Sequence, residues 1–135
     1  LIHVHRADRH GNAQIEGISG FAAEMARASK RLIISAEEIV PTEEIRKYPD
    51  RTIIPYYLVD AVIHAPFGSH PGEMAYVYAR DEAEIKAWVE ASKTAEGAQA
   101  YLDKYVRGVK DHDEYLKLIG DERLKECTEL REKRI

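Results

Sequence analysis

The sequence predicts an α/β protein with an open, mainly parallel sheet, flanking helices and a helical C-terminal tail. In residues 1–80, short apolar runs alternate with helical patterns. Strands that alternate with helices form parallel sheets whose faces the helices cover. Residues 81–135 show helical spacing alone. We therefore expect an α/β unit over residues 1–80 and a helical extension over residues 81–135 that packs on it.

The first predicted elements are a strand, a turn and a helix. Residues 1–7 have the apolar content of a strand, and Gly11 and Asn12 form the turn that follows it. Residues 13–16 are a short candidate partner strand. Residues 21–29 show helical spacing, because their larger apolar side chains lie four positions apart.

The middle of the chain supplies further strands. The apolar run at residues 32–34 is typical of a strand that is covered on both faces. A short helix follows over residues 42–48, and strand material returns at 52–54 and 58–63, on either side of Pro55. The resulting sheet has only three or four strands, so we expect another segment or subunit to cover its open edge.

The second part of the chain predicts helices whose ends are marked by capping residues. Asp81 and Glu84 have the spacing of a capping box, and Gly120 stops a later helix. The predicted helices lie near residues 81–92, 98–106, 111–119 and 121–135.

Composition limits the partners of the chain. At 135 residues it is long enough to bury its own core, and a net charge of −4 gives no electrostatic reason to expect nucleic acid. No apolar stretch approaches the ~20 residues that cross a bilayer. The single cysteine, Cys127, cannot form an internal disulfide, which is typical of the reducing cytoplasm. We expect Cys127 to be a helix residue without chemical function.

The chain begins abruptly, inside an apolar run and without an initiator methionine. Most chains start with a few expendable residues. We therefore expect this chain to be the C-terminal portion of a longer protein.

The loop at residues 65–72 has the composition of a ligand site. Two prolines fix the backbone, two glycines let it approach a ligand, and Ser69 and His70 offer hydrogen-bonding groups. Backbone amides and the Ser69 hydroxyl are suited to an acyl or phosphate group. Because residues 8–12 also follow a predicted strand with small polar residues, we expect a ligand edge on the sheet.

Histidines near the start give a second interpretation. His3 and His5 point to one face of a strand, so both can ligate a metal, with Asp8 as a third ligand. No further ligands of known spacing accompany them. The favoured interpretation is that these histidines lie at a pocket rim or a subunit contact and that no metal is bound.

Residues that could act directly in catalysis are weakly indicated. Glu16 is a lone carboxylate near two glycines, and a turn position facing solvent explains it. Glu37 and Glu38 are adjacent, so their side chains diverge, and Glu38 is expected in a cap or an ion pair. Ser69 and His70 are neighbours without a Gly-x-Ser-x-Gly elbow, which argues against a serine hydrolase. We assign no catalytic residue to this chain.

Several motifs in order give a resemblance to a known family. Together they resemble the alpha subunit of family I coenzyme A-transferases, with the glutaconate CoA-transferase branch as the nearest in pattern. The resemblance covers about residues 1–90. Its motifs are DRHGNA at 8–13, ASKRLII at 28–34, EEIVP at 37–41, IPYYLVDAV at 54–62 and APFGSHP at 65–71.

The resemblance implies an enzyme built from two kinds of subunit. This chain would be the C-terminal half of an alpha subunit, whose N-terminal part is missing, in a hetero-oligomer with a beta-type subunit. The reaction moves CoA between carboxylic acids through an acyl-glutamyl anhydride and a glutamyl-CoA thioester. The glutamate belongs to the partner subunit. The CoA thioester is a substrate, and no tightly bound cofactor is implied.

Within this family the two loops would line the acyl pocket at the subunit interface. The candidate substrate-binding residues are Gly11, Asn12, Phe67, Gly68, Ser69 and His70. Two alternatives stay open. The chain can belong to a hydrolase of the same fold that opens a ring in CoA-linked steroid fragments, or to a non-catalytic scaffold subunit that completes a neighbour's pocket.

Overall fold

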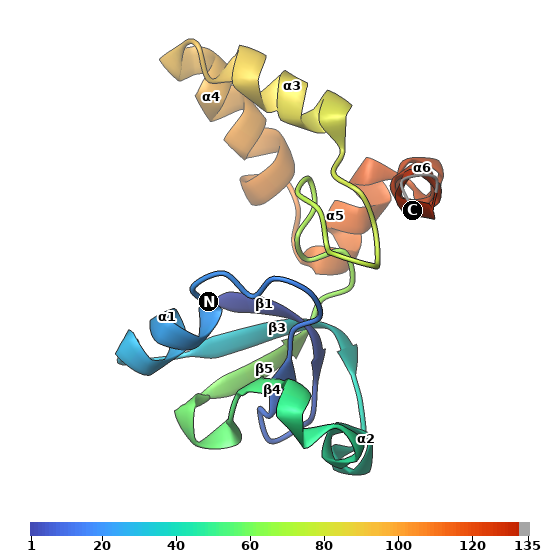
Figure 1. Cartoon of the computed structure of the whole chain (residues 1–135). Coiled ribbons are helices and arrows are strands. Elements are labelled where there is room, and N and C mark those ends of the chain that lie inside the picture. Colours follow the sequence, from blue (N-terminus) through green and yellow to red (C-terminus); the bar gives the residue numbers. More distant parts are fainter. Residues whose placement is uncertain (133–135) are drawn as a thin grey trace. The chain divides into compact units, whose positions relative to one another are not determined.

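The computed structural model describes residues 1–132, which form two compact units (Figure 1). The first unit is Leu1–Gly68 and the second begins at Ser69. The boundary falls before residue 80 because the segment after Gly68 bonds to the helices that follow it. For example, the amide of Ala79 donates to the carbonyl of Cys127 at 2.9 Å.

The first unit contains an open sheet of five strands in the order β4-β2-β1-β3-β5. Strands β1, β3 and β5 are parallel, whereas β2 pairs antiparallel with both β1 and β4. The predicted open α/β sheet is confirmed, and its strands are mixed in direction. The strands are β1 (Ile2–Ala7), β2 (Ala13–Gln14), β3 (Ile33–Ile39), β4 (Thr52–Ile54) and β5 (Ala61–His64).

Two strand predictions need correction. The run predicted at 58–63 begins as the 3₁₀ helix Tyr56–Leu58, because the carbonyl of Pro55 accepts the amide of Leu58 at 3.1 Å and closes a turn. The strand predicted at 32–34 extends to Ile39. It includes Glu37 and Glu38, because each finds a partner on the neighbouring strand β1: His3 for Glu37 and Arg6 for Glu38.

The core of the first unit consists of apolar side chains and small residues. Helix α1 (Ala22–Ala28) contributes Ala26 to this core, and α2 (Thr42–Lys47) buries Ile45. Large aliphatic side chains stabilise a fold by about 1.5–3 kcal/mol each when fully buried. The core residues are Val4, Ala7, Ala13, Ala26, Leu32, Ile34, Ala36 and Ile54.

The strands present different residues on their other face. Side chains alternate along a strand, so residues on either side of Val4 and Ala36 point away from that core. The register pairs His3 with Ser35, and it places His5 opposite Glu37, between the pairs Val4–Ala36 and Arg6–Glu38. This face is therefore polar at the centre of the parallel strands.

The second unit is built from the predicted helices. Asp81, Thr94 and Asp111 each accept backbone amides as N-caps, and Gly120, with φ of 90°, ends α5. No helix in the described part of the chain is long and apolar enough to cross a membrane. The helices are α3 (Glu82–Ala91), α4 (Ala95–Leu102), the π-helical turn η3 (Asp103–Arg107), α5 (His112–Ile119) and α6 (Asp121–Glu132).

Candidate functional site

The loop after β1 is organised by a buried carboxylate. Oδ1 of Asp8 accepts the amides of His10 at 2.9 Å and Asn12 at 3.0 Å, and Oδ2 accepts the Asn12 side-chain amide at 2.9 Å. Burial favours a higher pKa for the Asp8 carboxyl. The hydrogen bonds from Asn12, Thr42 and His10 outweigh it and hold that pKa below its ordinary value. Asp8 thus shapes the loop.

Gly11 and Asn12 have defined places in this loop. Gly11 has φ of +100°, and a Cβ there would lie 2.7 Å from the Cβ of Val59, so only glycine fits. Oδ1 of Asn12 accepts the amide of Tyr56 at 3.2 Å. Asn12 also borders an open hollow of about 400 Å³, whose other lining residues are Arg9, His10, Thr42, Glu43, Arg46 and Tyr56.

The loop after β5 is held by a polar group on the sheet, which we call the His3–Glu37 network: His3, Ser35, Glu37, Phe67 and Gly68. Nε2 of His3 donates to Oε1 of Glu37 at 2.7 Å, and Nδ1 of His3 lies 2.9 Å from the Ser35 hydroxyl. Oε2 of Glu37 accepts the amide of Phe67 at 2.7 Å. The side chains of His3 and Glu37 are only 13% and 10% exposed.

Gly68 packs directly on the imidazole of His3. A Cβ at Gly68 would lie 2.5 Å from Cε1 of His3 and 2.8 Å from the carbonyl oxygen of Ala65. The Gly68 amide donates to that carbonyl at 3.0 Å. The amides of Phe67 and Gly68, which we expected to face a ligand, are therefore used inside the first unit in this structure.

The structure separates Asp8 from His3, two of the three residues considered above as alternative metal ligands. His3 and Asp8 lie at opposite ends of β1, about 16 Å apart at the rise of an extended strand. The Nδ1 atom of His5 accepts the amide of Glu16 at 3.1 Å, and His3 is held by Ser35 and Glu37. These residues build loops and sheet contacts around the strand.

The three glutamates singled out from the sequence are all engaged. Arg6 lies 3.2 Å from the carboxylate of Glu38 and 3.6 Å from that of Glu16. Glu37 bonds to His3 on the other face of β3. The two adjacent glutamates thus diverge as the alternation of a strand requires, and Glu38 is in an ion pair as expected.

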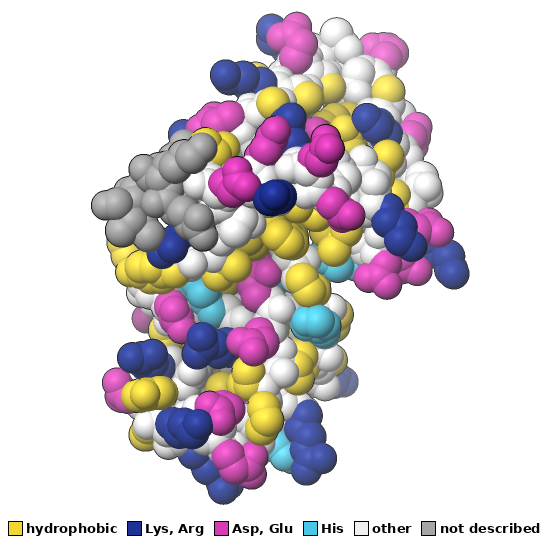
Figure 2. All heavy atoms as spheres, turned by 90° about the vertical axis from the view of Figure 1, so that its right-hand side faces the viewer, with side chains coloured by type: hydrophobic (Ala, Val, Ile, Leu, Met, Phe, Trp, Pro, Cys, Tyr) yellow, Lys and Arg dark blue, Asp and Glu magenta, His cyan; other side chains and the backbone are white. Residues whose placement is uncertain are grey.

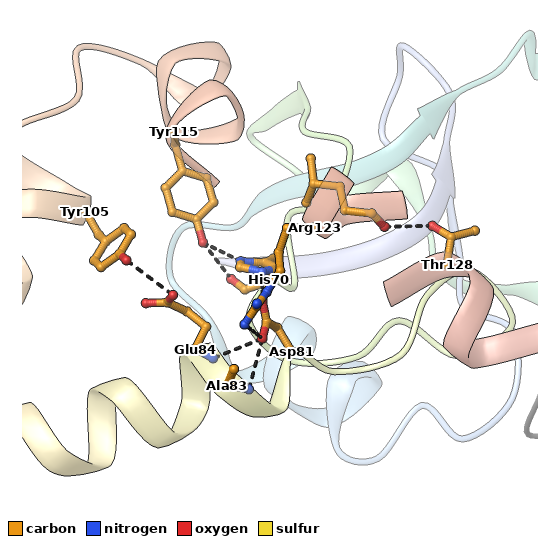
Figure 3. Close-up of polar contacts among 9 residues, drawn as sticks. His70, Asp81, Ala83, Glu84, Tyr105, Tyr115, Arg123 and Thr128 are labelled. Atoms are coloured by element: carbon orange, nitrogen blue, oxygen red, sulfur yellow. Dashed lines mark hydrogen bonds and ion pairs between the residues drawn. The ribbon is translucent and has the colours of Figure 1, made fainter. Parts of the chain in front are cut away.

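A second polar group lies in the other unit (Figure 3). We call it the Asp81 network: His70, Asp81, Tyr115 and Arg123. Arg123 reaches both oxygens of Asp81, at 2.6 and 2.7 Å. Nε2 of His70 lies 3.3 Å from Oδ2 of Asp81, and Nδ1 of His70 lies 2.6 Å from the Tyr115 hydroxyl. Asp81 also caps α3 by accepting the amides of residues 83 and 84.

Ser69 and His70 lie at the start of this unit and are already bonded there. The Ser69 amide donates to the Tyr78 hydroxyl at 3.0 Å, and its hydroxyl contacts the sulfur of Met74 at 3.7 Å. The His70 side chain is 0% exposed and has a partner on each ring nitrogen. Within this unit, His70 joins helices; direct contact with a ligand would require this network to open.

Two groups in the Asp81 network, the carboxyl of Asp81 and the phenol of Tyr115, have shifted pKa values. Burial favours a higher pKa for the Asp81 carboxyl, but Arg123, the Glu84 amide and His70 hold that pKa well below its usual range. Burial, with the nearby charges of Glu84, Tyr105 and Asp81, raises the pKa of Tyr115 to about 12. Both shifts favour the ionised carboxylate and the neutral phenol.

Cys127 lies beside this network. Its thiol, together with His70 and Asp81, offers three metal-type donor atoms within 4.8 Å of one another. The Asp81 carboxylate is already neutralised by the Arg123 guanidinium, which supplies the positive charge that a metal ion would otherwise bring. Burial and the Asp81 carboxylate raise the pKa of the Cys127 thiol. We interpret Cys127 as a buried residue of α6 that packs beside the Asp81 network.

The depressed pKa of Asp81 makes a pH-dependent contribution to stability. Because the folded pKa lies below the unfolded value of about 3.9, this contribution is present above that pH and is lost as the pH falls through the folded pKa. We expect the free energy of unfolding to fall below about pH 4, and to fall less steeply in Asp81→Asn. Denaturant unfolding between pH 5 and pH 2 measures both slopes. Equal slopes in the two proteins would contradict the assignment.

Figure 2 shows the distribution of charged side chains on one face of the molecule. On the face shown in Figure 2, acidic and basic side chains are interspersed over both units rather than gathered by sign.

Comparison with known proteins gives the class. Residues 1–65 match the family model for coenzyme A transferase. The crystal structure of glutaconate coenzyme A-transferase from Acidaminococcus fermentans superposes on 92% of this chain with a TM-score of 0.89 and 39% sequence identity. The chain is therefore similar to the coenzyme A transferase family over most of its length.

Within that family the similarity is to A-type subunits. The A-type subunit of glutaconate CoA-transferase from Acidaminococcus fermentans is 39% identical over 92% of this chain, which covers 39% of that protein. An uncharacterized protein of Archaeoglobus fulgidus is 52% identical over 98% of this chain, which covers 31% of it. The cholesterol ring-cleaving hydrolase IpdA subunit of Mycobacterium tuberculosis is 35% identical over 78% of this chain and is covered to 37%. The chain thus spans between three- and four-tenths of the length of these relatives.

Proposed function

We propose that this chain is part of the A-type subunit of an acyl-CoA:carboxylate CoA-transferase, which works together with a beta-type partner subunit. The observation that carries the proposal is the combined sequence and structural similarity to the A-type subunit of glutaconate CoA-transferase over 92% of the chain. The CoA thioester is a substrate of this reaction and no tightly bound cofactor takes part.

The carboxylate nearest to the loop at residues 65–68, that of Glu37, is poorly placed to be the attacking group, which supports a partner that provides it. A glutamate that attacks a thioester needs an accessible carboxylate. Glu37 does not meet this requirement, because its side chain is only 10% exposed and is held by His3 and the Phe67 amide. In the proposed enzyme Glu37 links the sheet to the loop after β5. The loops at residues 11–12 and 67–70 line the acyl pocket.

The test uses the full-length protein purified together with its partner subunit. Incubation of an acyl-CoA with a second carboxylic acid should give the second acyl-CoA, with ping-pong kinetics. Mass spectrometry during turnover should find the covalent CoA adduct on the partner. An adduct on a glutamate of this chain, or no transfer to any acid in a broad panel, would contradict the proposal.

A second candidate is a CoA-thioester hydrolase that opens a ring, which the similarity to the IpdA subunit favours. The same assay separates the two activities. A hydrolytic ring-opening enzyme consumes its CoA-linked substrate without a second carboxylic acid, whereas a transferase requires that acceptor.

A further inference from the structure

We propose that Glu37 and His3 are positioning residues that hold the loop at residues 65–68 in the shape that the acyl pocket requires. The inference rests on the proposed function, in which this loop lines the pocket. Neither side chain needs to touch the substrate. Their effect passes through the Phe67 amide and the packing of Gly68.

Glu37 joins the sheet to the loop with both oxygens of one carboxylate. Oε1 accepts from His3 at 2.7 Å and Oε2 accepts from the Phe67 amide at 2.7 Å. Hydrogen bonds to an ionised group are about twice as strong as neutral ones, and the Glu37 side chain is only 10% exposed. The loop is thus tied to a well-shielded charge.

The loop needs this support because its backbone is strained. Phe67 has φ of 57°, a left-handed conformation that is costly for a residue with a side chain. Such residues persist where their surroundings over-determine them, and they gather at functional sites. Here the support comes from the Glu37 carboxylate on the amide of Phe67 itself.

His3 is the second residue that holds the loop. Its ring is fixed at both nitrogens, by Ser35 and by Glu37, and it contacts the position where Gly68 has no side chain. A serine hydroxyl either donates or accepts, so the contact with Nδ1 persists in both protonation states of His3. The imidazole ring of His3 therefore limits how closely Gly68 and its loop can approach the sheet.

The same three residue types occur in a Ser–His–Glu triad, but the geometry here favours positioning. Ser35 is only 8% exposed and lies within the sheet. The amides of Phe67 and Gly68, the nearest donors on the loop, already donate to Glu37 and Ala65. Ser35 is thus not an accessible nucleophile, and these two loop amides are not free to form an oxyanion site.

The test compares Glu37→Gln with Glu38→Gln in the full-length protein bound to its partner subunit. Both variants remove one negative charge from β3, but Glu38 faces Arg6 on the opposite side. We expect Glu37→Gln to lower kcat/KM for transfer by tenfold or more and to raise the KM of the acceptor acid. Glu38→Gln should stay within twofold. Equal effects of the two substitutions would overturn the proposal.

A second measurement does not depend on activity. Hydrogen–deuterium exchange at the Phe67 amide should speed up at least tenfold in Glu37→Gln and stay unchanged in Glu38→Gln. Ser35→Ala, a milder change, should give a smaller effect in the same direction if Glu37→Gln fails to fold. Unchanged exchange in the folded variant would refute positioning. If the unmodified enzyme transfers no CoA while the Phe67 amide still exchanges faster in Glu37→Gln, the proposed function alone is refuted.

Discussion

Replacement of Asp81 by alanine should strongly destabilise the second unit. Loss of a side-chain N-cap and of a hydrogen bond to a charged group together cost about 2–4 kcal/mol, because the Arg123 side chain is 37% exposed and is not left as a buried charge. Asp81 is 4% exposed, and its loss leaves the Arg123 guanidinium, His70 and two amides at the start of α3 without their acceptor. We expect the free energy of unfolding of the second unit to fall by that amount.

Denaturant unfolding followed by circular dichroism measures this loss. Asp103→Ala is a matched control, because Asp103 pairs with Arg107 on the surface of the same unit and both side chains are more than half exposed. Exposed pairs are worth about 0–1 kcal/mol. If both variants lose the same small amount, the Asp81 network does not anchor the helices.

Replacement of Gly68 by leucine should reduce turnover strongly while the subunits still assemble. The first added carbon already meets Cε1 of His3 at 2.5 Å and a backbone oxygen at 2.8 Å, so the loop or the imidazole must move. A shift of about 1 Å in a group that positions a substrate can cost about 100-fold in rate. We expect a decrease of that size in the proposed CoA transfer.

Steady-state kinetics and size-exclusion chromatography of the complex separate the two effects. Gly20→Asn is the control, since a Cβ at Gly20 meets nothing within 4 Å and asparagine tolerates its φ of +55°. Normal turnover in Gly68→Leu would show that the loop shape does not matter for catalysis. Loss of the complex would show that Gly68 serves assembly instead.

The fold was largely predictable because its signals are local. The apolar runs gave the parallel strands, and the aspartates and Thr94 cap helices through side-chain bonds within three residues. Strand β2 has only two residues and carries no periodic signal. Its antiparallel pairing with β1 and β4 depends on contacts between distant segments, so the mixed character of the sheet was not predictable from periodicity.

The candidate loops were predictable, whereas their bonding was not. Glycine and proline mark residues 65–72 in the sequence, but the amides of Phe67 and Gly68 turn out to bond within the first unit. The pairing of His3 with Ser35 requires the register of β1 and β3. Arg123 reaches Asp81 across 42 residues of sequence, a distance over which no motif gives a signal.

The alternation of polar and apolar residues along residues 34–37 of β3 also specifies how this strand pairs with β1. A slip of one residue between β1 and β3 would turn every side chain of the strand to the wrong face. Ser35 and Glu37 would then point into the hydrophobic core, and Ile34 and Ala36 would leave it. Both changes are unfavourable, so the polar and the apolar residues of β3 each disfavour the shifted register.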